Sequence, residues 1–237
     1  AVGAGPGPTA PHRAAAAPPP RPRNSTLSDT SSQHPPDSPH GEPNRPRSAV
    51  HGREAGNPPA TGSAGTPAAR RWPTRPEREA DAAAVHALHA AAFPTEDEAR
   101  LVDALRRDPG AWLPGLSYVA EAPDRSVAAH ALLTRCRVGE APALALAPVA
   151  TDPARQGQGA GTAVIRAVLE AARARGERLV VVLGHPDYYP RFGFVRASSY
   201  GIRTSFEVPD EALMALVLDG SDEAPGGTIC YPDAFGV

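Results

Sequence analysis

The chain has 237 residues, including 29 prolines and 22 glycines, and only 5% of the residues are aromatic. Its formal net charge is −2, and all 24 basic residues are arginine. The lack of lysine excludes Schiff-base chemistry and a lysine-containing phosphate loop, and two cysteines are too few for a disulfide scaffold.

Composition divides the chain near residue 70. Residues 1–70 contain 15 of the prolines and only three large apolar residues. Such a segment cannot bury enough apolar surface to offset its conformational entropy, so we predict that it is disordered. It is either a passive extension or a tail that binds a partner through proline runs such as 18–20. Residues 71–237 are long enough to form one folded domain.

Charge and hydropathy indicate where the protein works. Residues 71–237 carry 17 arginines against 22 acidic residues, which argues against a dedicated nucleic-acid binder. No run of 18 apolar residues and no apolar signal segment is present, so we expect a cytoplasmic protein without a membrane partner. In that compartment Cys136 and Cys230 are expected to be reduced, small and buried.

The first elements of the folded part are a short strand and a helix. Residues 72–76 are predicted to form an edge strand, because their prolines cannot donate to a sheet ladder. Residues 80–93 have a helical period, with Val85, Leu88 and Ala92 on one face. Pro94 ends this helix.

A second helix follows from residue 95. Thr95 and Glu98 have the spacing of a capping box, in which each side chain accepts a bond from the other residue's backbone N–H. Leu101, Val102 and Leu105 are expected to be buried. Residues 108–110 end the helix.

The spacing of the apolar residues then changes from a period of 3.6 residues to a period of 2. Residues 117–122 and 127–138 are predicted strands joined by a turn, and therefore form a hairpin. Residues 143–150 form a third strand that is apolar on both faces, which indicates burial. Pro148 lies inside this strand and cannot donate to a ladder, so the sheet should be broken or splayed there.

A helix and a buried strand complete a βαβ unit. The helix begins after Gly161 and ends at Gly176, and the strand covers residues 179–183. This spacing predicts a right-handed crossover, and hence an α/β fold with a mixed sheet. The apolar face of the helix consists of Val164, Ile165, Val168, Leu169 and Ala172. The later predicted elements are a helical turn near 187–192, a strand at 194, a strand at 213–218 and an edge segment at 228–231.

The segment between the third strand and the helix is rich in glycine. Glycines there let the backbone approach a ligand, and the free N–H groups of a helix N-terminus favour phosphate. The segment lacks the G-K-[ST] of a P-loop and the G-x-G-x-x-G of a dinucleotide site. We expect a phosphorylated ligand, with a plain tight turn as the alternative. Its residues are Gln156, Gly157, Gln158, Gly159, Ala160 and Gly161.

Two motifs in this arrangement resemble the GNAT superfamily of acyl-CoA-dependent N-acetyltransferases. Gln156, Gly159 and Gly161 match its Q/R-x-x-G-x-G/A motif, and residues 189–194 match its Y-x-x-x-G-F segment. The order of predicted elements is also the order of the family. The resemblance covers about residues 72–220, and residues 183–189 are similar to a bacterial subgroup of predicted acetyltransferases.

The resemblance implies a GNAT fold: a central mixed, mostly antiparallel sheet with a βαβ cofactor unit and flanking helices. It implies that acetyl-CoA is the cosubstrate, that a primary amine attacks it directly, and that Tyr189 protonates the departing thiolate. A backbone N–H at Ala150 or Thr151 would bind the thioester oxygen, which can contribute about 3–4 kcal/mol. The cofactor-binding residues implied in this way are Val149, Ala150, Thr151, Gln156, Gly157, Gln158, Gly159, Ala160 and Gly161.

Several alternatives remain open. Tyr188 competes with Tyr189 for the acid role, and His185, His130 and Glu121 are candidates for the general base, beside water or no base at all. No metal is expected, because no carboxylate or cysteine pattern accompanies the pair His86 and His89, which share one helix face.

The function and the partners also have alternatives. A domain that binds acetyl-CoA without turnover, as a sensor or interaction module, would share the same loop. The acceptor would be a small-molecule or peptide amine, and a homodimer is possible. The acetyltransferase domain is assigned to 71–237, with a C-terminal extension from about 221.

Overall fold

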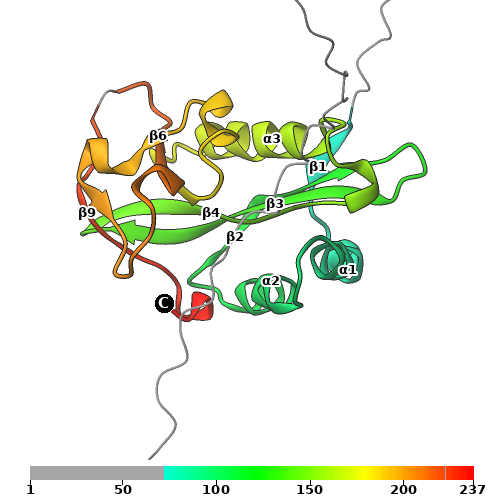
Figure 1. Ribbon diagram of the computed structural model, residues 1–237. Coiled ribbons are helices and arrows are strands. Elements are labelled where there is room, and N and C mark those ends of the chain that lie inside the picture. Colours follow the sequence, from blue (N-terminus) through cyan, green and yellow to red (C-terminus); the bar gives the residue numbers. More distant parts are fainter. Residues whose placement is uncertain (1–71, 222) are drawn as a thin grey trace, which may run out of the picture. The chain divides into compact units, whose positions relative to one another are not determined.

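The computed structural model describes residues 72–221 and 223–237, so the predicted tail 1–70 lies outside the described residues. The described part forms a nine-stranded sheet with helices on both faces, as Figure 1 shows. The strand order is β1-β2-β3-β4-β5-β8-β6, while β9 pairs with both β3 and β7. The strands are β1 (Thr74–Pro76), β2 (Trp112–Glu121), β3 (Val127–Val138), β4 (Ala141–Thr151), β5 (Leu179–Leu183), β6 (Val195–Arg196), β7 (Ile202–Arg203), β8 (Leu213–Val217) and β9 (Gly227–Cys230).

The sheet is mixed and mostly antiparallel, as predicted. β4 runs parallel to β5, and β7 runs parallel to β9, whereas the other paired strands are antiparallel. The helix α3 connects β4 to β5 and completes the predicted βαβ unit. The three α-helices are α1 (Ala82–Ala92), α2 (Asp97–Arg107) and α3 (Ala160–Ala174).

The helix α3 covers one face of the sheet and buries the apolar face that its period predicts. Val164, Ile165, Val168 and Leu169 pack in one cluster with side chains of β4 such as Leu144. Each aliphatic side chain buried in this way contributes about 1.5–3 kcal/mol of transfer free energy. Gly176 ends the helix with a φ of 79°, a conformation that favours glycine.

The helices α1 and α2 cover the opposite face (Figure 1). Val85 of α1 and Val102 and Leu105 of α2 are fully buried against Val119 and Leu132 of the sheet. Within the described residues, none of the helices has the length and hydropathy to cross a membrane.

The sheet splays where Pro148 predicts. In the pairing of β3 with β4, Ala147 and Pro148 together stand opposite Leu132, which is a β-bulge. The ladder between β4 and β5 pairs Leu144 with Val180 and Ala145 with Val181. β4 itself continues to residue 151. The last part of β4 therefore diverges from β5 and leaves a gap between the two strands.

Three local predictions were wrong. The hydroxyl of Thr95 bonds to the carboxylate of Asp97 at 2.9 Å, so it does not form the predicted capping box with Glu98. Leu101 is only half-buried, because it lies at the edge of the α2 contact. Cys230 is exposed because its strand β9 lies at the rim of the sheet, whereas Cys136 is buried as expected.

Candidate active site

The glycine-rich loop has a backbone that only glycine adopts readily. Gly157 and Gly159 have φ values of 73° and 93°, in the left-handed region. Gly159 is the N-cap of α3, so the first N–H groups of that helix have no acceptor within the helix. The loop thus presents backbone donors and the positive end of a 15-residue helix at one point.

Side chains just before the loop hold this segment in place. Asp152 accepts a bond from the N–H of Ala154 at 2.9 Å. Arg155 bonds to the hydroxyl of Ser126 at 2.8 Å and to the carboxylate of Asp124 at 3.1 Å, which ties the loop to the turn between β2 and β3.

Trp72 is a loop contact that the sequence analysis missed. Its indole Nε1–H donates to the carbonyl of Gln158 at 2.8 Å, and its ring lies 3.9 Å from the position of a Cβ on Gly159. The sequence analysis placed this residue only at the start of an edge strand. The available signal was a tryptophan outside the apolar periods, since a buried indole N–H requires a hydrogen-bond partner.

Gly161 allows three segments to meet. A Cβ on this residue would lie 2.7 Å from Oγ1 of Thr151 and 3.3 Å from the hydroxyl of Tyr188. The Tyr188 hydroxyl is also 3.4 Å from Oγ1 of Thr162. The end of β4, the first turn of α3 and the segment before the 3₁₀ turn Tyr189–Phe192 are therefore in direct contact.

The register of β4 decides which backbone groups face the gap. Asp152 donates its N–H to the carbonyl of Ala128 at 2.9 Å, and His130 is the partner of Ala150. Bonded and non-bonded positions alternate along an antiparallel pair, so the N–H of Ala150 points toward β3. The N–H groups of Val149 and Thr151 point the other way, toward the gap.

Tyr189 lies beneath this meeting point. It is fully buried, and its hydroxyl has no hydrogen-bond partner among the described residues. A Cβ on Gly184 would lie 2.2 Å from the Tyr189 ring, so glycine is required for the ring to pack against the end of β5. Burial raises the pKa of the Tyr189 hydroxyl, followed by a smaller contribution from Tyr188, and the phenol therefore keeps its proton.

Two of the base candidates occupy different surroundings. His185 is half-buried and lines a pocket of about 260 Å³ beyond the end of β5, together with Leu183 and Glu211. Glu121 accepts a bond from Arg75 at 2.8 Å and is the last residue of β2, at the end of the sheet where β4 also ends.

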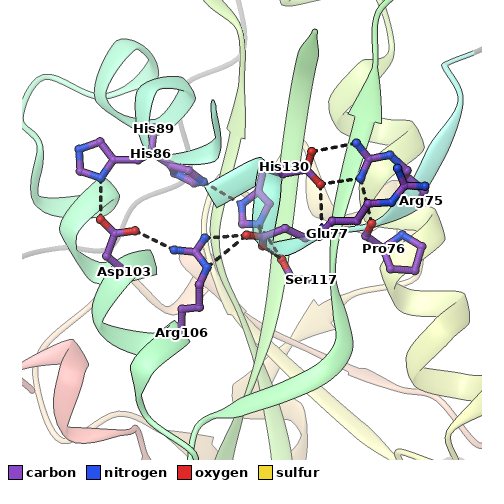
Figure 2. Close-up of polar contacts among 11 residues, drawn as sticks. Arg75, Pro76, Glu77, His86, His89, Asp103, Arg106, Ser117 and His130 are labelled. Atoms are coloured by element: carbon purple, nitrogen blue, oxygen red, sulfur yellow. Dashed lines mark hydrogen bonds and ion pairs between the residues drawn. The ribbon is translucent and has the colours of Figure 1, made fainter. Parts of the chain in front are cut away.

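His130, the third candidate, belongs to a buried polar network that joins five segments (Figure 2). Its Nδ1 is 2.9 Å from Nε2 of His89 on α1, and its Nε2 is 2.8 Å from the hydroxyl of Ser117 on β2. The Ser117 hydroxyl donates to Glu77, which also receives Arg106 of α2 at 2.7 Å. The sequence indicates His130 as a candidate base but gives no sign of these partners.

The charges of the network are buried and paired. Burial alone would raise the pKa of Glu77, but the bonds from His130 and Ser117 and the charge of Arg106 outweigh it and lower the pKa to about 2. Burial lowers the pKa of His89 well below its ordinary value, and the charge of Arg106, joined by that of His130 whenever His130 is protonated, lowers it further. Glu77 is therefore ionised and His89 neutral near pH 7.

The histidines of α1 do not form a pair. His86 bonds to Asp103 of α2 at 2.7 Å, whereas His89 points to His130. Among residues 72–221 and 223–237, no group of three or more histidine, cysteine or acidic side chains is arranged to hold a metal ion.

The sequence of the chain is similar to those of known proteins. Residues 73–197 match a family model described as an acetyltransferase (GNAT) domain. The chain is 38% identical over 138 residues to the uncharacterized N-acetyltransferase YjhQ of Escherichia coli K12, covering 56% of this chain and 75% of YjhQ. It is 32% identical over 155 residues to the uncharacterized N-acetyltransferase YhbS of the same strain, covering 65% of this chain and 90% of YhbS.

Two solved structures are similar to the described part. The crystal structure of YhbS from Escherichia coli in complex with CoA superposes with a TM-score of 0.65 at 28% identity, over 70% of this chain and 93% of that one. A GNAT family acetyltransferase from Brucella melitensis in complex with acetyl-CoA gives a TM-score of 0.57 at 32% identity, over 70% and 98%. The range 73–197 contains the loop, both tyrosines and the buried network.

Proposed function

This chain belongs to the GNAT family of N-acetyltransferases, and on that premise we propose that it transfers the acetyl group of acetyl-CoA to a primary amine by direct attack. We assign this activity to residues 71–237. The observation that carries the proposal is the meeting of the loop, the splayed end of β4 and Tyr188 around Gly161. The two similar proteins crystallised with CoA and acetyl-CoA support the choice of cosubstrate.

The α3 face of the sheet binds the cosubstrate. The loop Gln156, Gly157, Gln158, Gly159, Ala160 and Gly161 holds the pyrophosphate with backbone N–H groups and the helix dipole. The pantetheine arm lies along Val149, Ala150 and Thr151, where β4 lacks a partner strand. The N–H groups of Val149 and Thr151 face the gap, so the one at Thr151 stabilises the thioester oxygen in the transition state.

Tyr189 donates a proton to the departing thiolate. Two observations support this role: its hydroxyl has no hydrogen-bond partner in the described part of the chain, and its raised pKa keeps the proton in place until the thiolate forms. Tyr188 is the alternative acid, because its hydroxyl lies beside Gly161 at the start of α3. The two assignments differ only in which of the two phenol hydroxyls donates the proton.

The acceptor amine approaches from the face opposite α3. Leu183 packs against the cluster of Val181 and Ala145, which lies on that face, and it also lines the pocket with His185 and Glu211. The pocket has room for a small amine, and a carboxylate at its rim favours a cationic one. The cosubstrate and the acceptor then meet at the gap between β4 and β5.

The test measures binding and transfer separately. Acetyl-CoA at a hundredfold excess over its Kd should stabilise the chain by about 2.7 kcal/mol in thermal unfolding. Gly161→Val should abolish that shift, because its side chain collides with Thr151 and Tyr188. Ala174→Val places the same residue at the exposed end of α3 and serves as the control.

Transfer is scored as CoA thiol release with a panel of primary amines: an aliphatic diamine, an amino sugar and a peptide N-terminus. Amine-dependent release supports the proposal. Binding without release from any of these amines would favour the acetyl-CoA sensor. A Gly161→Val variant that still binds acetyl-CoA would contradict the site itself.

A further inference from the structure

The buried network contains one nitrogen that no other group of the described residues binds. His89 is fully buried, and its Nδ1 has no hydrogen-bond partner among the described residues. A buried polar atom without a partner costs stability, about 1–3 kcal/mol, so its presence requires an explanation. The other end of the same imidazole is bonded to His130 at 2.9 Å.

The hydrogen-bond pattern determines which nitrogens carry protons. The single hydroxyl proton of Ser117 goes to the ionised Glu77, so its oxygen must accept from Nε2–H of His130. When His130 is neutral, its Nδ1 is bare and accepts from Nε2–H of His89. A neutral His89 then has a bare Nδ1, which is a lone pair available to take a proton.

The network also has a counter-charge for an incoming proton. The carboxylates of Glu77 and Asp103 face the single guanidinium of Arg106, which leaves one net negative charge when the three histidines are neutral. Only 3% of the Glu77 side chain is exposed, so this charge is poorly screened by solvent. The ionisable and polar groups that face the histidine pair are Glu77 after β1, His86 on α1, Asp103 and Arg106 on α2, and Ser117 on β2.

The histidine pair lies beside the proposed reaction centre. His130 is the strand partner of Ala150, so both side chains lie on the face that α1 covers. Ala150 packs against Leu88 and Phe93, and the ring of His89 stacks on Phe93 with a centroid distance of 5.9 Å. Ala150 also lies between the two residues whose N–H groups face the gap.

We propose that His89 is the proton acceptor of the acetyl transfer, with His130 and Glu77 positioning it and balancing its charge; this inference rests on the proposed function. As the amine lone pair forms the C–N bond and the C–S pair leaves on sulfur, the amine N–H breaks and its proton goes to Nδ1 of His89, directly or through one water. The Nε2 proton of His89 moves to Nδ1 of His130. The positive charge then lies on His130, whose Nε2–H is held by Ser117 and Glu77. After the product leaves, the proton returns to solvent through His89.

The first experiment determines which histidine nitrogens carry protons, and it needs no acceptor amine. In the full chain with ¹⁵N-labelled histidine and saturating CoA, ¹⁵N–¹H correlation spectra at pH 7 should show His89 with a bare Nδ1 and a protonated Nε2. Nδ1–H on His89 would overturn the proposal, because no lone pair would then be available.

The second experiment uses the best acceptor amine from the panel. Glutamine at position 89 keeps an N–H for His130 but cannot accept a proton. We therefore expect His89→Gln to lower kcat by about 10²–10⁴-fold, with the Kd of CoA unchanged. Ala87→Gln, at an exposed position of the same helix, should turn over at the parent rate.

The pH profile distinguishes catalysis from a purely structural role. Glu77→Gln removes the negative charge that stabilises an added proton on the network, so the acidic limb of kcat/KM should move to lower pH. A fully active His89→Gln, or a slow one whose CoA affinity and melting temperature fall together, would overturn the proposal. A parent chain that acetylates no amine would overturn the proposed function, and the proton-acceptor role with it, whereas parent activity combined with an active His89→Gln overturns only the proton-acceptor role.

Discussion

The two faces of the sheet bury different kinds of side chain. Between the sheet and α3, the buried side chains are almost all apolar, and the groups that can bind a ligand are backbone amides of the loop before the helix. Between the sheet and the helices α1 and α2, an apolar cluster adjoins a chain of buried charges and histidines that includes Glu77 and His130. The same sheet therefore has one face suited to holding an anion and another suited to moving a proton.

The difference follows from what each task needs. A phosphate can be bound by N–H groups and a helix dipole without any charged side chain, so glycines are sufficient to shape the site. Proton transfer needs a titratable group with a tuned pKa, and burial together with a charged partner tunes it. β4 is the element common to both faces, since Thr151 contacts the start of α3 while Ala150 packs against α1.

The largest expected effect tests whether the α3 face does more than bind. Tyr189→Phe should lower kcat about 10²–10⁴-fold, because it removes the proton donor for the thiolate. The free energy of unfolding should stay the same or rise, because the lost hydroxyl is buried and unpartnered. Steady-state kinetics and urea denaturation of the same preparation measure the two quantities.

Tyr188→Phe is the matched control for that experiment. Its hydroxyl contacts Thr162, so we expect a modest change in acetyl-CoA affinity and little change in kcat. If Tyr188→Phe loses turnover and Tyr189→Phe does not, the acid is the neighbouring residue. Full activity in both variants would mean that the α3 face binds the cosubstrate but donates no proton.

The two faces also differ in how well the sequence predicts them. The apolar period of α3, the loop before it and the break at Pro148 are local patterns, so the helix, the position of the loop and the splay could all be predicted. The buried network could not, because Glu77 and His130 are 53 residues apart and His89 and His130 are 41 apart. A histidine in a strand gives no local sign of the carboxylate that will face it.

Misjudged details have the same cause. Thr95 has the spacing of a capping box, but the N-cap of α2 is Glu96, and the hydroxyl of Thr95 bonds to the carboxylate of Asp97. Trp72 was assigned to an edge strand, yet its partner Gln158 is 86 residues away. Local propensity predicts the element, whereas the partner of a polar group depends on the assembled fold.

The next effect concerns the stability of the folded chain at acidic pH, which depends on Glu77 on the face that α1 and α2 cover. The pKa of Glu77 is lowered from an ordinary 4.5 to about 2, so its ionised form stabilises the folded chain. That contribution, about 3 kcal/mol, is fully present above pH 4.5 and is lost as the pH falls from 4.5 toward 2. In urea denaturation, Glu77→Gln should be less stable than the parent at pH 7, and the difference should shrink toward pH 3.

Glu140→Gln is the control, because Glu140 is almost fully exposed in its pair with Arg137. Its effect should be under about 0.5 kcal/mol at every pH. A difference between parent and Glu77→Gln that is the same at pH 7 and pH 3 would show that Glu77 acts through packing rather than charge. The contrast between the two faces would then disappear.

The smallest effect concerns Trp72, whose side chain bonds to the backbone of the glycine-rich loop. Trp72→Phe keeps a buried aromatic ring but removes the N–H that donates to the carbonyl of Gln158 at 2.8 Å. A hydrogen bond of this kind contributes about 0.5–1.5 kcal/mol, so the Kd of acetyl-CoA should rise by up to about tenfold while kcat stays near the parent value. Trp112→Phe is the matched control: the ring of the second tryptophan lies 5.5 Å from the guanidinium of Arg106, on the side of α2, and its loss should leave the Kd unchanged. Titration calorimetry with acetyl-CoA measures both variants. Equal affinity in Trp72→Phe and the parent would mean that the glycine backbone and Arg155 hold the loop unaided, and a loss of kcat without a loss of affinity would place Trp72 in the chemistry instead.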